Sequence, residues 1–360
     1  MQKERVLMAM SGGIDSSVAA MLLLEQGYEL VGCTFRTFDS MRESCLKKEK
    51  GCCSVDSIME AKHLAEQLHF EHHIVDFRQT FRDSVIRNFV EEYKAGRTPN
   101  PCVICNSHIK WGVLLKTAAE YGCSRIATGH YARIASADGH WYLKRAADTQ
   151  KDQTYFLWML TEDNLKRTIF PLGDLTKNEV REIARQHGFE QLSQKRESQE
   201  ICFIPDNDYR RFLTEEGCSP EEGNYLSADG RIVGQHRGYM FYTIGQRKGL
   251  GIALGEPAFV TGINAETNEV TLGRHDDLYT HTVYLRNGRF LRDVTRPVMA
   301  QIRYRSMPTE AMVQIEKPMT TNSQSSAFSL HFTEPVWAVT PGQSCVIYQD
   351  DLLVGAGLIG

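Results

Sequence analysis

The 360-residue chain has no long hydrophobic run and no excess of positive charge. Its longest apolar stretches, such as 6–10 and 21–24, are far too short for a helix that crosses a bilayer. The formal net charge is −4, so no overall basic field indicates a nucleic-acid partner, and an RNA site would have to be a local patch. The amino-terminal residues also lack the pattern of a secretion signal. We therefore expect a cytoplasmic protein with no membrane partner.

Repeats and low-complexity tracts are not evident either, and what remains is typical of a multidomain globular protein. A length of 360 residues predicts two or three domains. Because no secretion signal is evident, we expect the ten cysteines to serve as thiols, metal ligands or catalysts rather than as a disulfide scaffold. Cys33, Cys123 and Cys345 lie in apolar segments, so we expect them to pack as small hydrophobic side chains.

The first part of the chain alternates strand-like and helix-like segments. A buried strand at 6–10 is followed by a Gly/Ser turn, a helix at 17–26 and a strand at 29–34. Strands are also expected at 74–77 and 124–128, with helices at 81–93 and from about 102 to 121. This alternation predicts an α/β fold over residues 1–207, a doubly wound parallel sheet with helices on both faces.

Beyond about residue 208 the long helical patterns disappear. Glycines become frequent, and short segments rich in Val, Ile, Thr and Tyr stand between turn residues. Residues 260–272 predict a hairpin with its turn near 266–268. We expect a small central β-rich domain at 208–277 and a carboxy-terminal β-barrel at 278–360.

A glycine- and serine-rich loop, Ser11–Ser17, directly follows the first strand and opens the first helix. Glycine lets the backbone approach a ligand closely, and a helix amino terminus attracts phosphate. The Gly-Lys-Ser/Thr ending of the kinase and GTPase P-loop is absent. The S-G-G-x-D-S pattern instead resembles the PP-loop of ATP pyrophosphatases. The alternative is a purely structural turn that caps a helix. The expected ATP-binding residues here are Ala9, Met10, Ser11, Gly12, Gly13, Ile14, Asp15 and Ser16, with Asp15 a candidate for positioning Mg²⁺.

Two cysteines stand in segments that suit reactive thiols. Residues 96–106 form a loop between two helices, stiffened by two prolines, and Cys105 falls near the start of the second helix. A thiol there is expected to be acidified by the helix dipole. Far downstream, Cys202 lies at the mouth of an apolar segment, where the alternative is a buried core thiol.

These motifs and others along nearly the whole chain are similar to those of the tRNA-specific 2-thiouridylases. The further matching stretches are 127–133 (ATGHYAR), 151–157 (KDQTYFL), 170–173 (FPLG), 201–204 (ICFI), 242–247 (YTIGQR) and 340–343 (TPGQ). The resemblance implies a tRNA-uridine 2-sulfurtransferase, in which ATP adenylates O2 of the wobble uridine and sulfur then replaces that oxygen. It implies that Cys202 carries a persulfide and that Cys105 is its partner thiol, with a disulfide left after each turnover. It also implies two partners, tRNA and a sulfur donor such as a cysteine desulfurase or a sulfur-relay protein.

The chain departs from the family at Cys102, where the 2-thiouridylases usually have an aspartate that contacts the target base. A thiol is a weak hydrogen-bonding group and titrates several units higher, so it is a poor substitute for a carboxylate. The change creates a Cys102-x-x-Cys105 pair with Cys202 elsewhere in the sequence. Three thiolates would also suit a [4Fe–4S] cluster with one open iron, which would make a persulfide unnecessary.

The remaining site residues are implied by the same resemblance. Phe35 and Gly129 are expected beside the adenosine. The expected contacts with tRNA or its target base are Asn100, Pro101, Cys102, His130, Lys151, Asp152, Gln153, Arg303, Tyr304, Arg305 and Gln343. Strand alternation over 301–305 would put both arginines on one face of the barrel, where phosphates could bind. The alternatives are a structural histidine, a polar helix start and a solvated strand edge.

Two other functions remain open at the level of sequence. One is an ATP pyrophosphatase that activates a carboxylate or another base for amination, which would need no pair of catalytic thiols. The other is a non-catalytic RNA-binding paralogue, suggested only by Cys102. Pyrophosphate release that depends on tRNA distinguishes this paralogue from a sulfurtransferase.

Overall fold

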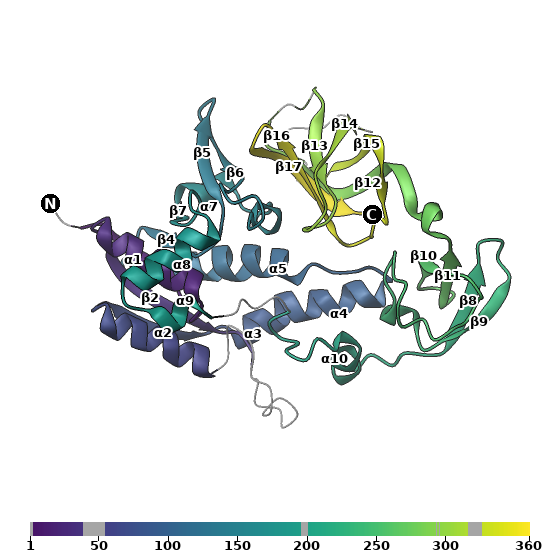
Figure 1. Ribbon diagram of the computed structural model, residues 1–360, viewed down its shortest axis with the longest axis horizontal. Helices are drawn as coiled ribbons and strands as arrows, with labels where there is room; N and C mark the ends of the chain where they lie inside the picture. The colour runs from purple at the N-terminus through teal and green to yellow at the C-terminus, as the bar shows by residue number, and fades with distance from the viewer. Residues whose placement is uncertain (1–2, 39–54, 196–200, 293, 295, 316–325) are drawn as a thin grey trace. The chain divides into compact units, whose positions relative to one another are not determined.

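The computed structural model describes residues 3–38, 55–195, 201–292, 294, 296–315 and 326–360. The chain divides into two compact units, one formed by 1–86 with 101–208 and the other by 87–100 with 209–360. Figure 1 shows the helices and strands of both. Within the described ranges, no helix is long and apolar enough to cross a membrane.

The first unit is built on a five-stranded parallel sheet, which confirms the predicted α/β fold. Its strands run in the order β3-β2-β1-β4-β7. The bounds are β1 Arg5–Ala9, β2 Glu29–Arg36, β3 Glu71–Asp76, β4 Arg125–Ala127 and β7 Thr168–Ile169. Val6, Leu7 and Met8 of the central strand are fully buried, as expected for a strand covered on both faces.

Helices cover both faces of this sheet. From β1 the chain moves outward to β2 and β3, then returns to add β4 and β7 on the other side of β1. Because such crossovers are right-handed, the helices before and after β3 lie on opposite faces. The first set is α1 (Ile14–Glu25) and α2 (Val55–Gln67); the second is α3 (Arg78–Phe81), η1 (Arg82–Ile86), α5 (Pro101–Ile104), η2 (Cys105–Val113) and α6 (Leu114–Glu120). Beside α1 packs α8 (Lys177–Gln186) (Figure 1).

The helix α1 begins three residues before the predicted start at 17. Gly13 is the last extended residue, with φ −89° and ψ 159°, so the second half of the glycine-rich loop is already helical. The other elements of this unit are the hairpin β5 (Arg133–Ala137) and β6 (His140–Lys144), η3 (Thr154–Phe156), α7 (Glu162–Lys166) and α9 (Glu190–Ser193). The expectation for Cys33 and Cys123 is confirmed, since both are buried.

The second unit contains a four-stranded sheet with the order β10-β11-β8-β9. The predicted hairpin is confirmed: β10 (Phe259–Asn264) pairs antiparallel with β11 (Glu269–Gly273), and Asn268 takes a positive φ of 53° in the turn. Tyr225, Val260 and Val270 are fully buried beneath this sheet. The other two strands of this sheet are β8 (Gly223–Ser227) and β9 (Ile232–His236). The unit also contains α4 (Arg87–Lys94), α10 (Tyr209–Glu215), η4 (Tyr239–Phe241) and η5 (His275–Leu278).

A closed barrel completes the second unit, as predicted for the carboxy-terminal part. The strands follow the order β12-β15-β14-β13-β16-β17, and pairing of β12 with β17 closes the ring. Their bounds are β12 Tyr279–Phe290, β13 Val298–Gln301, β14 Thr309–Ile315, β15 Ser326–Trp337, β16 Ser344–Gln349 and β17 Leu352–Ile359. Cys345 is fully buried in the barrel core, as expected.

One expectation for the barrel is wrong. Residues 301–305 were expected to alternate as a strand, but β13 ends at Gln301 and a turn follows. Ser306 N donates to Arg303 O at 3.0 Å, and Gln301 Nε2 donates to Tyr304 O at 2.7 Å. These local bonds take the place of pairing with a neighbouring strand. Arg303 and Arg305 therefore do not lie on one face of a strand.

A partly buried histidine in the sheet predicts how stability depends on pH. Thr34 Oγ1 lies 2.9 Å from His72 Nε2, and burial, with nearby positive charge, lowers the pKa of His72 to about 4. An unfolded chain titrates near a pKa of about 6.5. Stability from the neutral ring is therefore present above pH ~6.5 and is lost as pH falls toward 4, because only the unfolded state gains the proton. His72→Asn should flatten the fall in unfolding free energy between pH 7 and pH 5, measured by urea denaturation.

The matched control for this prediction is His63→Asn, since His63 is exposed on α2. It should leave the pH dependence as in the unsubstituted protein. Equal slopes for the His72 variant and the unsubstituted protein would contradict the assignment.

Candidate active site

Two loops meet at the edge of the parallel sheet where the strand order reverses. The loop after β1 and the loop after β4 leave neighbouring strands that connect in opposite directions. Ligands of open α/β sheets bind at this switch point. A Cβ on Gly129 would lie 2.7 Å from both Asp15 C and Ser16 N, so only glycine allows this approach of the two backbones. Gly129 therefore lies against the glycine-rich loop, and its predicted place beside the adenosine stays a prediction.

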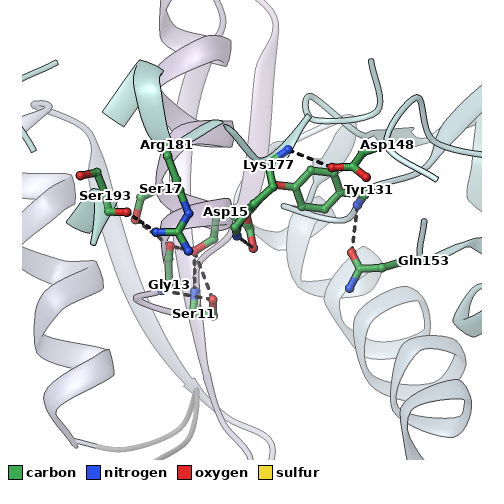
Figure 2. Close-up of polar contacts among 11 residues, drawn as sticks. Ser11, Gly13, Asp15, Ser17, Tyr131, Asp148, Gln153, Lys177, Arg181 and Ser193 are labelled. Atoms are coloured by element: carbon green, nitrogen blue, oxygen red, sulfur yellow. Dashed lines mark hydrogen bonds and ion pairs between the residues drawn. The ribbon is translucent and has the colours of Figure 1, made fainter. Parts of the chain in front are cut away.

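Hydrogen bonds of Gly13 with Ser11 and Ser17 fix the backbone of the glycine-rich loop (Figure 2). Gly12 has a φ of 68°, and a Cβ there would stand 2.2 Å from Ser57 O. Ser16 Oγ donates to Gly13 O at 3.0 Å and accepts from Ser11 N at 3.2 Å. Among the described residues, no side chain caps the amino terminus of α1. The loop thus presents a tight backbone turn and uncapped amides, an arrangement suited to phosphate.

Asp15 is joined to two side chains that sequence analysis did not assign to the site. Its Oδ1 and Oδ2 lie 2.7 and 2.9 Å from Lys177 Nζ, and Tyr131 Oη donates to Oδ1 at 2.8 Å (Figure 2). Lys177 is the first residue of α8 and is buried. Thr176 and Glu179 form a capping box that fixes this helix start. That Thr-x-x-Glu spacing was visible in the sequence and could have located Lys177.

A further cation lies on the glycine-rich loop. Lys195 Nζ donates to Gly12 O at 3.0 Å and also pairs with Glu60. Arg181 of α8 donates to Ser193 O, as Figure 2 shows. Lys177 and Lys195 are each paired with a carboxylate, so they bring cationic donors to the loop without adding net charge.

Cys102 and Cys105 occupy the first turns of a helix that begins at Pro101. Pro101 is buried, Cys102 is exposed, and Cys105 is half-buried. The helix begins one residue before the expected start near 102. Cys105 is its fifth residue and so lies just beyond the first turn, to which the main effect of the helix dipole is confined. Cys102 is in the first turn, and although part of its surface is exposed, the protein atoms around the thiol raise its pKa by desolvation, with Lys110 partly opposing the rise. Cys102 thus carries its proton at neutral pH.

Cys202 is exposed, which excludes a buried core thiol. It lies in a turn closed by Ile204 N donating to Ile201 O at 2.9 Å. The next residue, Phe203, is buried and packs edge-on against Phe81, with ring centroids 5.6 Å apart. The apolar neighbours of Cys202 therefore anchor the turn and leave the thiol accessible.

Cys102, Cys105 and Cys202 all lie in the part of the chain that the structure describes. In that part, no group of three or more His, Cys, Asp or Glu side chains could hold a metal ion.

His130 is buried beside a lysine that the sequence analysis missed. Its Nδ1 lies 2.7 Å from Thr128 Oγ1 and its Nε2 lies 3.3 Å from Lys110 Nζ. Burial, and then the Lys110 charge, holds the pKa of His130 well below its usual range. The ring is therefore neutral, with a polar partner at each nitrogen. Lys110 belongs to the π-helix η2, whose i→i+5 bonding places it on the same side as Cys105.

Two residues of the predicted Lys-Asp-Gln contact are engaged inside the first unit. Asp152 is buried and accepts from Ala146 N at 3.0 Å and Thr154 Oγ1 at 2.8 Å. Gln153 Oε1 accepts from Tyr131 N at 2.9 Å. The Gln153 bond braces the loop after β4, whereas the Asp152 bonds tie residues 146 and 154 together. Lys151 is half-exposed.

The other predicted contacts differ in exposure. Arg305 is exposed, whereas Asn100, Tyr304 and Phe35 are half-buried. Arg303 donates to Thr340 Oγ1 at 2.6 Å and lies over the Trp337 ring. Gln343 Nε2 donates to the carbonyls of Thr98 and Pro99, at 3.0 Å each.

Three family models match the chain in order. They are described as the tRNA methyl transferase HUP domain over 4–206, the tRNA methyl transferase PRC-barrel domain over 210–274 and the aminomethyltransferase beta-barrel domain over 280–359. The tRNA-specific 2-thiouridylase MnmA of Amoebophilus asiaticus is 48% identical, covering 100% of this chain and 96% of that protein. Those of Cytophaga hutchinsonii and Carboxydothermus hydrogenoformans are each 45% identical, covering 99% of this chain and 98% of their own.

This chain belongs to the tRNA-specific 2-thiouridylase family. Membership confirms the resemblance drawn from the motifs, and it extends over both loops and both thiols. The three matched models also confirm the predicted order of a parallel-sheet domain, a central domain and a barrel.

Proposed function

We propose that this protein is an ATP-dependent tRNA-uridine 2-sulfurtransferase that works in the cytoplasm on tRNA. The observation that carries the proposal is the meeting of the glycine-rich loop with Gly129 at the sheet's switch point. The same compact unit holds Cys105 and Cys202, and the second of these is exposed. A phosphate loop and two thiols are the parts that adenylation followed by sulfur transfer requires.

Adenylation begins with the uncapped amides of α1 and the charge of Lys177 holding the phosphates of ATP. The uridine O2 attacks the α-phosphorus, and pyrophosphate leaves, which converts O2 into part of an AMP leaving group. Asp15 is the carboxylate of the loop, and Mg²⁺ commonly binds through one or two carboxylates together with substrate phosphates. When bound there, it would neutralise the charge that builds on the departing pyrophosphate.

Sulfur transfer uses a persulfide on Cys202, formed by a sulfur-donor protein. Its terminal sulfur attacks C2 of the uracil and expels AMP, so that a disulfide links the base to Cys202. The thiolate of Cys105 then attacks the Cys202 sulfur, which releases 2-thiouridine and leaves a Cys105–Cys202 disulfide. A dithiol reductant returns both thiols and is itself oxidised. In the alternative order Cys105 first releases hydrosulfide, which attacks C2, and the same disulfide remains.

The persulfide route suits this chain better than an iron–sulfur cluster, because the three thiols are not grouped as metal ligands. Cys102 does not replace the family's carboxylate as a base, since the raised pKa keeps its thiol protonated. Lys110 brings a positive charge to the helix face of Cys105.

For tRNA we propose contacts that use the accessible members of the predicted set. Half-exposed Lys151 of the first unit would contact the target base, and exposed Arg305 would meet phosphate from the barrel at 278–360. Asn100 is half-buried and remains a candidate contact with tRNA. Buried His130 would shape the loop after β4, and buried Asp152 would hold residues 146 and 154 together.

Nucleoside analysis tests the proposed function directly. Unmodified tRNA incubated anaerobically with protein, ATP, Mg²⁺, a dithiol reductant, cysteine and a cysteine desulfurase as sulfur donor should yield 2-thiouridine, with AMP and pyrophosphate formed in equal amounts. AMP and pyrophosphate without a thionucleoside would favour an amination enzyme. Failure to form either, with tRNA still bound, would favour a non-catalytic paralogue. Iron assayed in protein purified without oxygen should be far below one cluster per chain, and one cluster lost in Cys102→Ala would refute the persulfide route.

A further inference from the structure

A turn of the barrel grips the loop that precedes Cys102. The turn, Pro341–Gln343, lies just before β16 and belongs to the same compact unit as residues 87–100. Thr98 N donates to Pro341 O at 2.8 Å. In return, Gln343 Nε2 donates to Thr98 O and Pro99 O, at 3.0 Å each. Three hydrogen bonds thus join two segments 245 residues apart in sequence.

The contact is so close that position 342 must be glycine. Gly342 has a φ of 89°, and a Cβ there would lie 2.8 Å from Thr98 O and 3.0 Å from Arg97 Cβ. The turn is itself tied to the last strand of the barrel, because Gly342 N donates to Ile359 O at 2.9 Å and Ile359 N donates to Gln343 O at 2.8 Å. The 341–343 turn is therefore a fixed part of the barrel.

The start of the same loop is held by a partly buried ion pair. Arg97 donates to both carboxylate oxygens of Glu92 at 2.7 Å, and Arg286 of β12 reaches Glu92 at 3.2 Å. The Glu92 side chain is only 13% exposed, so this pair is screened less than a surface pair. Thr98 Oγ1 also donates to Thr243 Oγ1 at 3.2 Å. The loop is anchored from Arg97 to Pro99.

The chain leaves the second unit for the first between Asn100 and Pro101, directly after these anchors. Pro101 begins α5, which carries Cys102 and leads into Cys105. We propose that the 341–343 turn is a positioning device for the catalytic thiol, with Gln343 as its positioning residue. The turn restricts the motion of the segment that leads to Cys105. Such restriction matters because a small displacement of a reacting atom lowers the reaction rate by a large factor. The role of Cys105 in this inference rests on the proposed function.

Hydrogen exchange tests the grip without any substrate. Gln343→Leu should speed exchange of the Thr98 amide by about tenfold, because the loop loses two of its bonds. Gln314→Leu, on an exposed position of β14, should leave it unchanged. Gly342→Ala should act like Gln343→Leu, whereas Gly230→Ala, with a similar φ of 82° and nothing within 4 Å of the added Cβ, should not. Unchanged exchange in both loop variants would overturn the grip.

Steady-state kinetics tests the positioning role. With saturating tRNA, Gln343→Leu should lower kcat for 2-thiouridine about tenfold and leave KM for tRNA unchanged. A raised KM with normal kcat would show instead that Gln343 serves only as a tRNA contact, and would overturn the role proposed here. Faster exchange with normal kcat would overturn it as well. If the unsubstituted protein forms no 2-thiouridine, the proposed function fails. Hydrogen exchange at the Thr98 amide still decides whether the 341–343 turn holds the loop.

Discussion

Cys202→Ser should lower 2-thiouridine formation by at least about a thousandfold, the scale on which loss of a covalent nucleophile is felt. Serine cannot carry a persulfide, so no sulfur reaches the adenylated base. The tRNA-dependent release of pyrophosphate should remain measurable, because Asp15, Lys177 and the glycine-rich loop are untouched. Nucleoside analysis and a pyrophosphate assay on the same reaction measure the two halves separately.

Cys105→Ser distinguishes the two routes of sulfur transfer. If the persulfide attacks C2 directly, the base stays linked to Cys202 by a disulfide that no thiol resolves, and a protein–tRNA adduct sensitive to reductant accumulates. If Cys105 must first release hydrosulfide, no adduct forms. Non-reducing electrophoresis with labelled tRNA shows which occurs. Cys218→Ala, which removes a buried thiol of the second unit, serves as the control and should retain activity. Full activity in both Cys105→Ser and Cys202→Ser would remove the thiol mechanism altogether.

Gly129→Ala should abolish ATP binding at micromolar concentrations and slow adenylation by about a hundredfold or more. The added Cβ would stand 2.7 Å from Asp15 C and Ser16 N, so the two loops at the switch point must separate. Overpacking of this kind also costs about 1–3 kcal/mol of stability. Isothermal titration with a non-hydrolysable ATP analogue and thermal unfolding measure the two effects.

Gly139→Ala separates loss of the site from loss of stability. Gly139 has a φ of 79° at the tip of the β5–β6 hairpin, and an added Cβ meets nothing within 4 Å. The substitution should lower Tm through backbone strain and leave nucleotide affinity as it was. Equal ATP affinity in the Gly129 variant and the unsubstituted protein would show that the loop after β4 does not shape the nucleotide site.

The elements of the site that could be predicted from sequence are those that depend on neighbours along the chain. A strand, two glycines and a helix start are local patterns, and they located the phosphate loop to within three residues of the helix start. The start of α5 was also placed closely, since it begins at Pro101 and was expected near 102. The dipole effect expected at Cys105 is weaker there, because Cys105 is the fifth residue of the helix and lies beyond its first turn.

Side-chain partners were mostly beyond prediction. Asp152 and Gln153 were expected to meet tRNA, yet Asp152 accepts from Ala146 N, and Gln153 accepts from Tyr131 N in the loop after β4. Polar residues look alike in a sequence whether they face water or satisfy a buried amide. Whether a polar residue is buried depends on which elements pack over it, and here those are other elements of the first unit.

The sequence by itself determined the family, the parallel sheet and the reactive groups, since periodicity and motif order depend on local burial and local backbone geometry. Only the tertiary structure decided which of those groups act together. Asp15 meets Lys177 across 162 residues, and Gln343 grips the loop before Cys102 across 245. No local pattern encodes such pairs, because they form only when separate elements pack, and packing selects partners by shape and charge in three dimensions.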